Sequence, residues 1–234
     1  MSHNVEENLI AIRKTLAAYP DARLLAATKT VPAEVINDAT QRLGVNLIGE
    51  NRAQELNEKY DALIKDHVEI HFIGALQTNK VKSIIGKVSM IHSLDSVRLA
   101  KAIDSACVQA GRTVDVLIEI NIAKEQAKSG IAAGDLFAFY EEIKSYSALQ
   151  VRGLMTMGPA GADENEYRRY FSQVKALYDS FVKEKIPHVQ APVLSMGMSE
   201  SYQIALACGS NLVRIGSGLF GKRNYGGKQQ STIK

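Results

Sequence analysis

The sequence predicts an α/β fold in which eight strands, each followed by a helix, close into a single (β/α)8 TIM barrel. Short apolar segments alternate with longer amphipathic ones along the whole 234-residue chain. Segments such as 114–118 are almost continuously apolar, which is typical of parallel strands covered by helices. No proline- or serine-rich linker divides the series. The pattern leaves an open doubly wound sheet as the alternative.

An extra helix is predicted before the first strand. Val5, Leu9, Ile12 and Leu16 recur at helical spacing, and Asn4 is a candidate N-terminal cap for them. This amphipathic helix is expected to lead directly into the barrel.

The strand candidates are short runs of mainly apolar residues, separated by amphipathic segments. The strands are expected at 23–28, 45–48, 69–73, 88–92, 114–122, 151–155, 193–194 and 211–215. The helices are expected at 33–43, 52–64, 97–110, 136–146, 164–184 and 199–208, with a shorter pattern at 78–85. Residues 1–225 are assigned to the barrel, and the polar, basic residues 226–234 to a loose C-terminal tail.

Composition indicates a globular protein without a membrane or nucleic-acid partner. The chain is 46% hydrophobic and 23% charged, and its apolar runs are much shorter than the roughly 20 residues of a membrane helix. Lys and Arg exceed Asp and Glu by 28 − 25 = 3, and the excess is spread along the chain. The first residues lack a basic region followed by an apolar stretch, which predicts a cytoplasmic location.

Metal, hydrolase and disulfide sites are not indicated. The histidines show no metal-ligand spacing, and Ser195 and His92 fit no hydrolase pattern with the carboxylates. Cys107 and Cys208 lie in segments expected to be helical. Reduced thiols are the simplest expectation for them, with a disulfide as the alternative.

Lys29 is unusual among the residues that follow the predicted strands. In a parallel barrel, the site forms at the carboxyl ends of the strands. Lys29 closes an apolar strand there, so its amine would point into the barrel mouth, where desolvation favours the neutral form. A neutral amine condenses with an aldehyde to a Schiff base, as in pyridoxal phosphate proteins and some aldolases. The alternative is a lysine that extends along the edge of a loop into water.

Two small-residue clusters follow the last two strands and favour an anion site. Ser195 to Ser199, Ser-Met-Gly-Met-Ser, precedes a predicted helix, and Gly216, Ser217 and Gly218 follow strand eight. Glycines let backbone N–H groups approach an anion, and barrels often bind phosphate in these two loops. A turn or a helix cap explains either cluster alone equally well.

Arg214 ends strand eight beside this predicted phosphate loop. It either forms a salt bridge at the rim or points at a ligand. A guanidinium only donates hydrogen bonds, so an arginine that faced a pyridine nitrogen would leave the nitrogen unprotonated and the ring a weaker electron sink. Glu50 and Asn51 could polarise the region around Lys29, and Asn51 could equally cap the helix expected from Arg52.

The chain resembles the YggS/PROSC family of pyridoxal phosphate-binding proteins. The resemblance covers almost the whole chain, and its most specific motifs are the block at 71–80 and Ser-Met-Gly-Met-Ser. The resembling stretches are 27–30, 48–51 with 54–55, 71–80, 92–96, 120–122 with 128–130, 152–157, 194–199 and 214–216 with 220–221.

This resemblance implies a barrel like the N-terminal domain of alanine racemase and pyridoxal 5′-phosphate as cofactor. Lys29 would hold the cofactor as a Schiff base, with Arg214 near its pyridine nitrogen and Asn51 and Met155 near its ring. The implied phosphate ligands are Ser195, Met196 and Gly197 through the backbone, Ser199, Gly216 and Ser217. Departures from the family pattern at Arg52, Ala123 and Ser201 concern the surroundings of these residues.

The resemblance further implies intracellular pyridoxal phosphate homeostasis rather than turnover. The protein would store or deliver the cofactor, possible recipients being apo-enzymes that depend on it, and would act as a monomer. A racemase of the related fold takes a second acid–base group, a tyrosine, from an additional β domain, whereas here only a tail with Tyr225 follows the barrel. The alternatives are a pyridoxal phosphate-dependent amino-acid racemase or decarboxylase, and a Schiff-base aldolase that grips a sugar phosphate.

Overall fold

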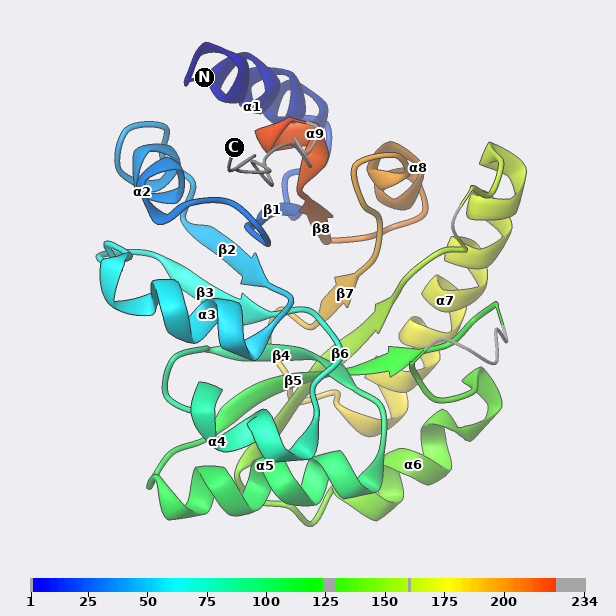
Figure 1. The fold of residues 1–234 in the computed structure, drawn as a ribbon. Coiled ribbons are helices and arrows are strands. Elements are labelled where there is room, and N and C mark those ends of the chain that lie inside the picture. The colour runs from blue at the N-terminus through cyan, green and yellow to red at the C-terminus, as the bar shows by residue number, and fades with distance from the viewer. Residues whose placement is uncertain (1, 124–128, 160, 222–234) are drawn as a thin grey trace, which may run out of the picture.

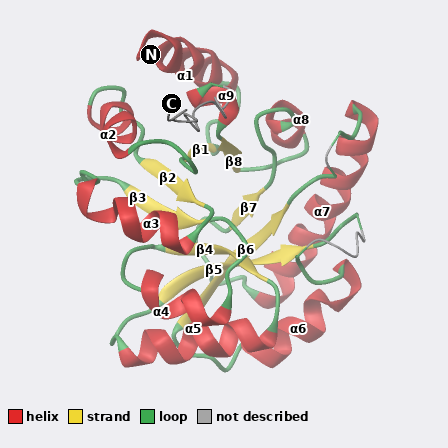
Figure 2. Cartoon of the chain, viewed as in Figure 1, coloured by secondary structure: helices red, strands yellow, loops and turns green. Residues whose placement is uncertain are grey.

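Eight parallel strands pair in chain order and close into a barrel in the computed structural model, which describes residues 2–123, 129–159 and 161–221. Helices surround the strands on the outside (Figures 1 and 2). The predicted barrel is therefore confirmed, and the open-sheet alternative is wrong. The expected tail at 226–234 lies outside the described residues.

The strands and helices alternate strictly from the first strand onward. The strands are β1 Arg23–Ala27, β2 Leu47–Glu50, β3 Glu69–Phe72, β4 Met90–Leu94, β5 Val114–Ile120, β6 Leu149–Thr156, β7 Val193–Ser195 and β8 Leu212–Ile215. The helices are α1 Ser2–Leu16, α2 Ala33–Gln41, α3 Ala53–Lys59, α4 Val81–Ile84, α5 Val97–Gln109, α6 Leu136–Ile143, α7 Glu164–Lys185, α8 Tyr202–Ala207 and α9 Ser217–Phe220. Short 3-10 turns lie at Tyr60–Ala62, Thr78–Lys80 and Ala133–Asp135.

Side chains alternate between two cores, because successive residues of a strand point to opposite faces of the sheet. On β8, Val213 and Ile215 pack in the core between strands and helices, and Leu212 packs inside the barrel. Arg214 therefore points into the barrel. The interior apolar clusters are Leu25, Ala27, Leu47, Ile73 and Leu212, and Met90, Leu117 and Met155.

The N-terminal helix α1 covers the part of the barrel that the short last helix leaves open. α9 has only 4 residues. α1 lies beside it in Figure 1, where the Asn8 amide donates to the Leu219 carbonyl at 3.0 Å. Val5, Leu9 and Ile12 are buried in the outer core. The expected helix is confirmed, but it begins at Ser2, so Asn4 lies inside it and is not its cap.

The long helix α7 begins at a capping box beside the barrel mouth. The Asp163 side chain accepts from the Glu166 amide at 2.9 Å, and the Glu166 side chain accepts from the Asp163 amide at 3.2 Å. These bonds satisfy two N–H groups that the first turn of a helix would otherwise leave unpaired. The cap fixes the first turns of α7, from which Tyr167 reaches the site described below.

Strand boundaries differ from expectation where the chain offers several apolar residues in a row. β2 begins at Leu47 rather than Val45, and β4 runs on to Leu94. The β4–β5 register shifts between Ile91 and Leu94, which moves the end of β4. Periodicity alone does not say which residues of such a run pair with the next strand.

Cys107 is buried, Cys208 is half-buried, and both are free thiols, as expected. Within the described ranges, no helix has the length and apolarity needed to span a bilayer.

Candidate functional site

A cavity of about 280 Å³ lies at the carboxyl-terminal mouth of the barrel. Its walls come from the carboxyl ends of β1 and β8, from the loops that follow β1, β2, β3, β6, β7 and β8, and from the first turn of α7. The lining residues are Ala27, Lys29, Asn51, Ile73, Met157, Tyr167, Met198, Ser199, Glu200, Ser201, Arg214, Gly216 and Ser217. The barrel thus brings together six residues that the sequence singled out: Lys29, Asn51, Ser199, Arg214, Gly216 and Ser217.

Lys29 lies in the turn that leaves β1, and a second lysine fixes that turn. The Lys59 ammonium donates to the carbonyl of Thr28 at 3.0 Å and to the carbonyl of Val31 at 3.2 Å. These two carbonyls bracket Lys29, which is half-buried and lines the cavity. The position of the Lys29 backbone therefore depends on Lys59, which is far along the chain at the end of α3.

Two carboxylates hold Lys59 in place. Its ammonium lies 2.8 Å from Glu50 Oε1 and 2.9 Å from Glu55 Oε1. The Thr28 hydroxyl donates to Glu50 Oε1 at 2.5 Å, and the Thr30 amide donates to Glu55. Glu50 is 0% exposed, and this burial raises its pKa against the opposing effects of Lys59 and Thr28. Glu50 thus stabilises the Lys29 turn through its contacts with Thr28 and Lys59.

Asn51 lines the cavity and does not cap α3. The N-terminal cap position of α3 is Arg52, without a side-chain cap bond, so the capping alternative is wrong. The Asn51 Oδ1 atom is buried, and within the described part of the chain it has no hydrogen-bond partner. Because buried polar atoms are nearly always paired, this oxygen is an acceptor that a bound molecule could satisfy.

Arg214 is a buried cation at the floor of the cavity. It is 4% exposed, and it donates to Ser195 Oγ at 2.5 Å and to the Thr156 carbonyl at 2.9 Å. Burial lowers the pKa of Arg214 to about 10, whereas the charge of Glu119 raises it. The guanidinium therefore keeps its charge at neutral pH.

The two small-residue loops meet at one edge of the cavity. Ser199 Oγ lies 3.2 Å from Ser217 Oγ and accepts from the Gly218 amide at 3.0 Å. Gly197 has φ +92, and a Cβ there would lie 2.5 Å from the Ala205 Cβ. A glycine is therefore needed at position 197 to bring α8 close to the strand end.

Four predicted residues do not line the cavity. Met155 is 1% exposed and packs with Met90 and Leu117 inside the barrel. The Met196 amide already donates to the Leu212 carbonyl at 3.2 Å and to Ser210 Oγ at 3.3 Å. The remaining two are the fully buried Ser195 and the buried Gly197.

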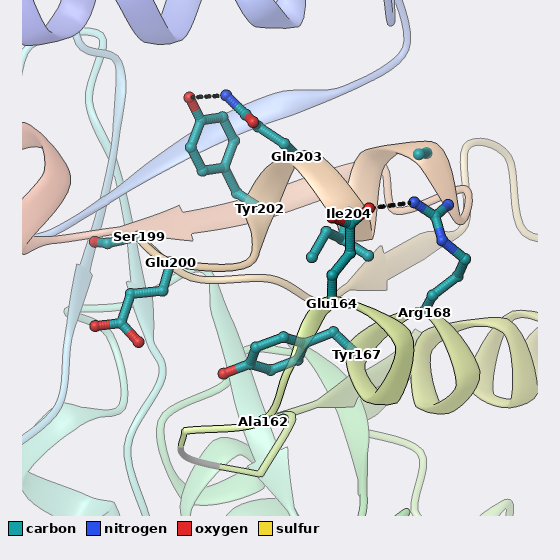
Figure 3. Close-up of a pocket in the computed structure, with 10 residues that line it drawn as sticks. Ala162, Glu164, Tyr167, Arg168, Ser199, Glu200, Tyr202, Gln203 and Ile204 are labelled. Carbon is teal, nitrogen blue, oxygen red and sulfur yellow. Dashed lines mark hydrogen bonds and ion pairs between the residues drawn. The ribbon is translucent and has the colours of Figure 1, made fainter.

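A larger groove of about 600 Å³ adjoins the cavity between α7 and α8 (Figure 3). It shares Tyr167, Ser199 and Glu200 with the cavity. Arg168 on its wall donates to Glu164 at 2.8 Å, so its charge is paired within the protein. Lys29 and Arg214 line the smaller cavity instead, which makes that cavity the candidate site.

Sequence reasoning missed Lys59, Tyr167 and the histidines of the barrel interior. Glu55 and Lys59 have the i,i+4 spacing of a helical ion pair, which reads as a solvated face until the fold buries it. His71 and His92 occupy inward positions of β3 and β4, a signal that alternation with Phe72 and Ile91 could have given. Tyr167 has no comparable signal.

Comparison with known proteins matches residues 2–224 to the family described as alanine racemase, N-terminal domain. Pyridoxal phosphate homeostasis proteins match this chain along most of their own length. The protein from Aquifex aeolicus is 43% identical, and the match covers 87% of this chain and 88% of that protein. The protein from Escherichia coli K12 is 33% identical, and the match covers 97% of this chain and 100% of that protein. The chain belongs to the pyridoxal phosphate homeostasis protein family, within the alanine racemase N-terminal domain family.

Solved structures share the fold of this chain. PipY of Synechococcus elongatus, solved with pyridoxal phosphate bound, has a TM-score of 0.81 and 31% identity, covering 93% of this chain and 100% of PipY. A structure described as an unknown protein from Bifidobacterium adolescentis has a TM-score of 0.85 and 32% identity, covering 93% of this chain and 95% of its own. Alanine racemase of Corynebacterium glutamicum, at 16% identity and a TM-score of 0.67, covers 99% of this chain and 63% of its own and shows the fold alone.

Proposed function

We propose that this chain binds pyridoxal 5′-phosphate as a Schiff base on Lys29 and serves cofactor homeostasis rather than turnover. The observation that carries the proposal is the cavity in which Lys29 and the buried Arg214 lie together. Relatives at 33–43% identity are named pyridoxal phosphate homeostasis proteins, and PipY was solved with this cofactor. These names support the same ligand for this chain.

The residues of the cavity suit the parts of this cofactor. Lys29 offers an amine for the aldehyde, and Asn51 offers a buried acceptor without a protein partner in the described residues. Arg214 would face the ring nitrogen. Because it only donates and keeps its charge, it would leave that nitrogen unprotonated and limit the electron-sink chemistry that the bound cofactor supplies.

The phosphate is proposed to lie where the loops after β7 and β8 meet. Ser199, Gly216 and Ser217 line the cavity there. The sequence-based set adds Ser195, Met196 and Gly197, of which Met196 has its amide already engaged. Met155 packs inside the barrel and does not line the cavity, so we propose only an indirect contact between Met155 and the ring.

The first experiment is the absorbance spectrum of the purified protein with pyridoxal phosphate, followed by borohydride reduction and peptide mass analysis. A band at roughly 420 nm that reduces onto the peptide carrying Lys29 is expected for this cofactor bound to lysine. Lys29→Ala should lose the band, and Lys101→Ala, an exposed lysine on α5, should keep it. A colourless wild type with unmodified Lys29 contradicts the proposal, and a trapped sugar-phosphate adduct would support the aldolase alternative.

Turnover is tested with the same preparations. We expect no racemisation or decarboxylation of alanine or serine near the roughly 10 per second of a typical enzyme. The racemase alternative gains one candidate group, because Tyr167 lines the cavity and burial raises its pKa. Racemisation at about 1 per second that Tyr167→Phe abolishes would replace our proposal with that alternative. Tyr225 lies outside the described residues.

The proposal extends to delivery of the cofactor by a cytoplasmic monomer. Loaded protein is expected to reactivate an apo-enzyme that depends on pyridoxal phosphate faster than an equal amount of Lys29→Ala incubated with the cofactor. Equal rates would contradict delivery. Sedimentation and cell fractionation test the monomer and the location.

A further inference from the structure

A row of polar side chains crosses the interior of the barrel from its far end to the candidate site. Glu69 begins β3 at the amino-terminal end, and its Oε2 lies 3.5 Å from His71 Nε2. His71 Nδ1 lies 2.9 Å from His92 Nε2, and His92 Nδ1 lies 3.2 Å from Ser195 Oγ. Ser195 Oγ accepts from Arg214 at 2.5 Å.

Four members of the row are deeply buried, whereas the Glu69 side chain at its end is 49% exposed. His71 is 2% exposed, His92 and Ser195 are 0% exposed, and Arg214 is 4% exposed. An unpaired polar group in such surroundings costs roughly 1–3 kcal/mol. The row therefore persists because each member satisfies the next.

The two ends of the row set the direction of its bonds. The Glu69 carboxylate only accepts, so His71 Nε2, which faces it, carries the proton of that neutral ring, and His71 Nδ1 accepts from His92 Nε2. His92 Nδ1 is then the acceptor of its ring and takes the Ser195 hydroxyl proton, while Ser195 Oγ accepts from Arg214, whose guanidinium only donates.

The Nε2 atom of His71 faces the Glu69 carboxylate at the far end of the row. His71 Nε2 faces Glu69 Oε2, and Glu69 Oε1 is held by Arg23 at 2.7 Å. Burial is the main cause that lowers the pKa of both His71 and His92, so both rings are neutral at neutral pH. Hydrogen bonds thus run from Arg214 to His71, whose Nε2 faces the Glu69 carboxylate at 3.5 Å.

We propose that Ser195, His92 and His71 form a directed hydrogen-bond chain that positions the Arg214 guanidinium for the ring nitrogen of the cofactor. The inference rests on the proposed function and assigns roles to three residues outside the cavity wall. Ser195 is then a positioning residue through its side chain, which is distinct from its predicted backbone contact with phosphate. His92 and His71 hold the Ser195 hydroxyl in the orientation that Arg214 requires.

The first test uses the ligand-free wild type and needs no variant. Nitrogen-15 NMR of the histidine rings at neutral pH distinguishes protonated from bare ring nitrogens. We expect both His71 and His92 to be neutral, with the proton on Nε2. A proton on Nδ1 of His92, or a charged ring at either position, would overturn the chain.

The second test measures the cofactor in variants. His92→Phe should weaken pyridoxal phosphate binding about tenfold, as expected when a bond that orients a charged group is lost, and should shift the absorbance maximum of the bound cofactor. Met90→Leu, a similar-sized change in the adjacent apolar cluster, should leave both unchanged. Identical affinity and spectrum in His92→Phe and Met90→Leu would refute the positioning role.

A third pair of variants keeps the inference testable when His92→Phe does not fold. Ser195→Thr retains the hydroxyl and should keep the wild-type absorbance maximum, whereas Ser195→Ala should shift it. Equal maxima in the two variants would count against the chain. Wild type that takes up no pyridoxal phosphate would instead contradict the proposed function, and the ring-nitrogen measurement would still decide the direction of the chain.

Discussion

At the scale of single residues, the candidate site depends as much on supporting charges as on the lysine that faces the cavity. The Lys59 ammonium contacts two backbone carbonyls of the Lys29 turn and the carboxylates of Glu50 and Glu55. Its side chain is 11% exposed and that of Glu50 is 0% exposed, so the pair is shielded from water. Loss of one partner would strand the other charge in the interior.

Lys59→Met keeps most of the side-chain volume and removes its charge. We expect the free energy of unfolding to fall by about 3 kcal/mol, the typical loss when one partner of a buried ion pair is removed. Urea denaturation followed by circular dichroism measures it. The double variant Lys59→Met/Glu50→Gln should recover part of the loss, and Lys101→Met should change stability by less than about 0.5 kcal/mol. No recovery in the double variant would show that the stranded charge is not the cause.

The same site predicts a dependence on pH. Burial raises the pKa of Glu50, so the folded state binds more protons than the unfolded state just above the usual glutamate pKa. Stability contributed by this carboxyl is therefore lost as the pH rises from the unfolded pKa through the folded one. In Lys59→Met, which lacks the opposing effect of Lys59, the loss of stability through Glu50 should be larger and extend to higher pH than in wild type, and Lys59→Met/Glu50→Gln should lack this contribution. Unfolding curves between pH 4.5 and pH 8, about the range of such shifts, test this.

The sequence could identify Lys29, Arg214 and the serine–glycine loops because they lie at the carboxyl ends of strands or just after them. In a parallel barrel, that position alone places a residue at the mouth. It could not identify Lys59 or Tyr167, because both lie on helices and reach the site only through the packing of α3 and α7. The Met196 amide illustrates the opposite error, since its motif suggested an anion ligand and the sheet had already engaged it.

At the scale of elements, one glycine allows β6 and β7 to lie side by side. Gly153 has φ +147, and a Cβ there would lie 2.0 Å from the Val193 carbonyl oxygen. Both the backbone conformation and the close approach exclude other residues. This contact sets the position of β7, and with it the Ser195 to Ser199 loop.

Gly153→Ala should lower the free energy of unfolding by about 2–4 kcal/mol, through the clash as well as the strained backbone. Chemical denaturation measures it. Gly111→Ala is the matched control, because Gly111 also has a positive φ, +63, but a Cβ added there would meet no described atom within 4 Å. Its expected loss is about 1 kcal/mol. Equal losses in the two variants would remove the clash from the explanation.

Element boundaries show where sequence patterns stop being informative. The period-2 and helical patterns predicted the order of strands and helices, because burial on one or both faces governs those patterns. They missed α9, a helix of 4 residues whose glycines are typical of a loop. Asn4 and Asn51 were both proposed caps, and the structure places the helix starts elsewhere.

At the scale of the whole molecule, ligand binding and folding are linked because the cavity exists only when the barrel is closed. Pyridoxal phosphate at about 100 times its dissociation constant should stabilise the folded state by about 2.7 kcal/mol. Thermal unfolding should therefore shift upward by several degrees, about 2–4 °C per kcal/mol for a chain of this size. Lys29→Ala should show a much smaller shift under the same conditions. An equal shift in the variant would mean that the stabilising site is elsewhere.

The number of paired residues differs between neighbouring strands of the barrel. β5 and β6 pair from Val114 with Leu149 to Ile120 with Thr156, whereas β7 and β8 register only at Ser195 with Leu212. Backbone amides of Met196, Asn211 and Arg214 donate to the carbonyls of Leu212, Leu194 and Gly197 across this pair, and a side chain adds a further bond. The Asn211 side chain accepts from the Leu194 amide at 2.7 Å.

The short pairing of β7 with β8 gives the proposed anion-binding loops a role in holding the barrel closed. Ser199 follows β7 and Ser217 follows β8, so a molecule held by both would bridge the two strands with the shortest register of paired residues in the barrel. Separation of β7 from β8 and departure of that molecule would then be a single coupled event. Hydrogen exchange of the backbone amides in β7 and β8 would report how often these strands separate. A molecule bound in the cavity should slow that exchange.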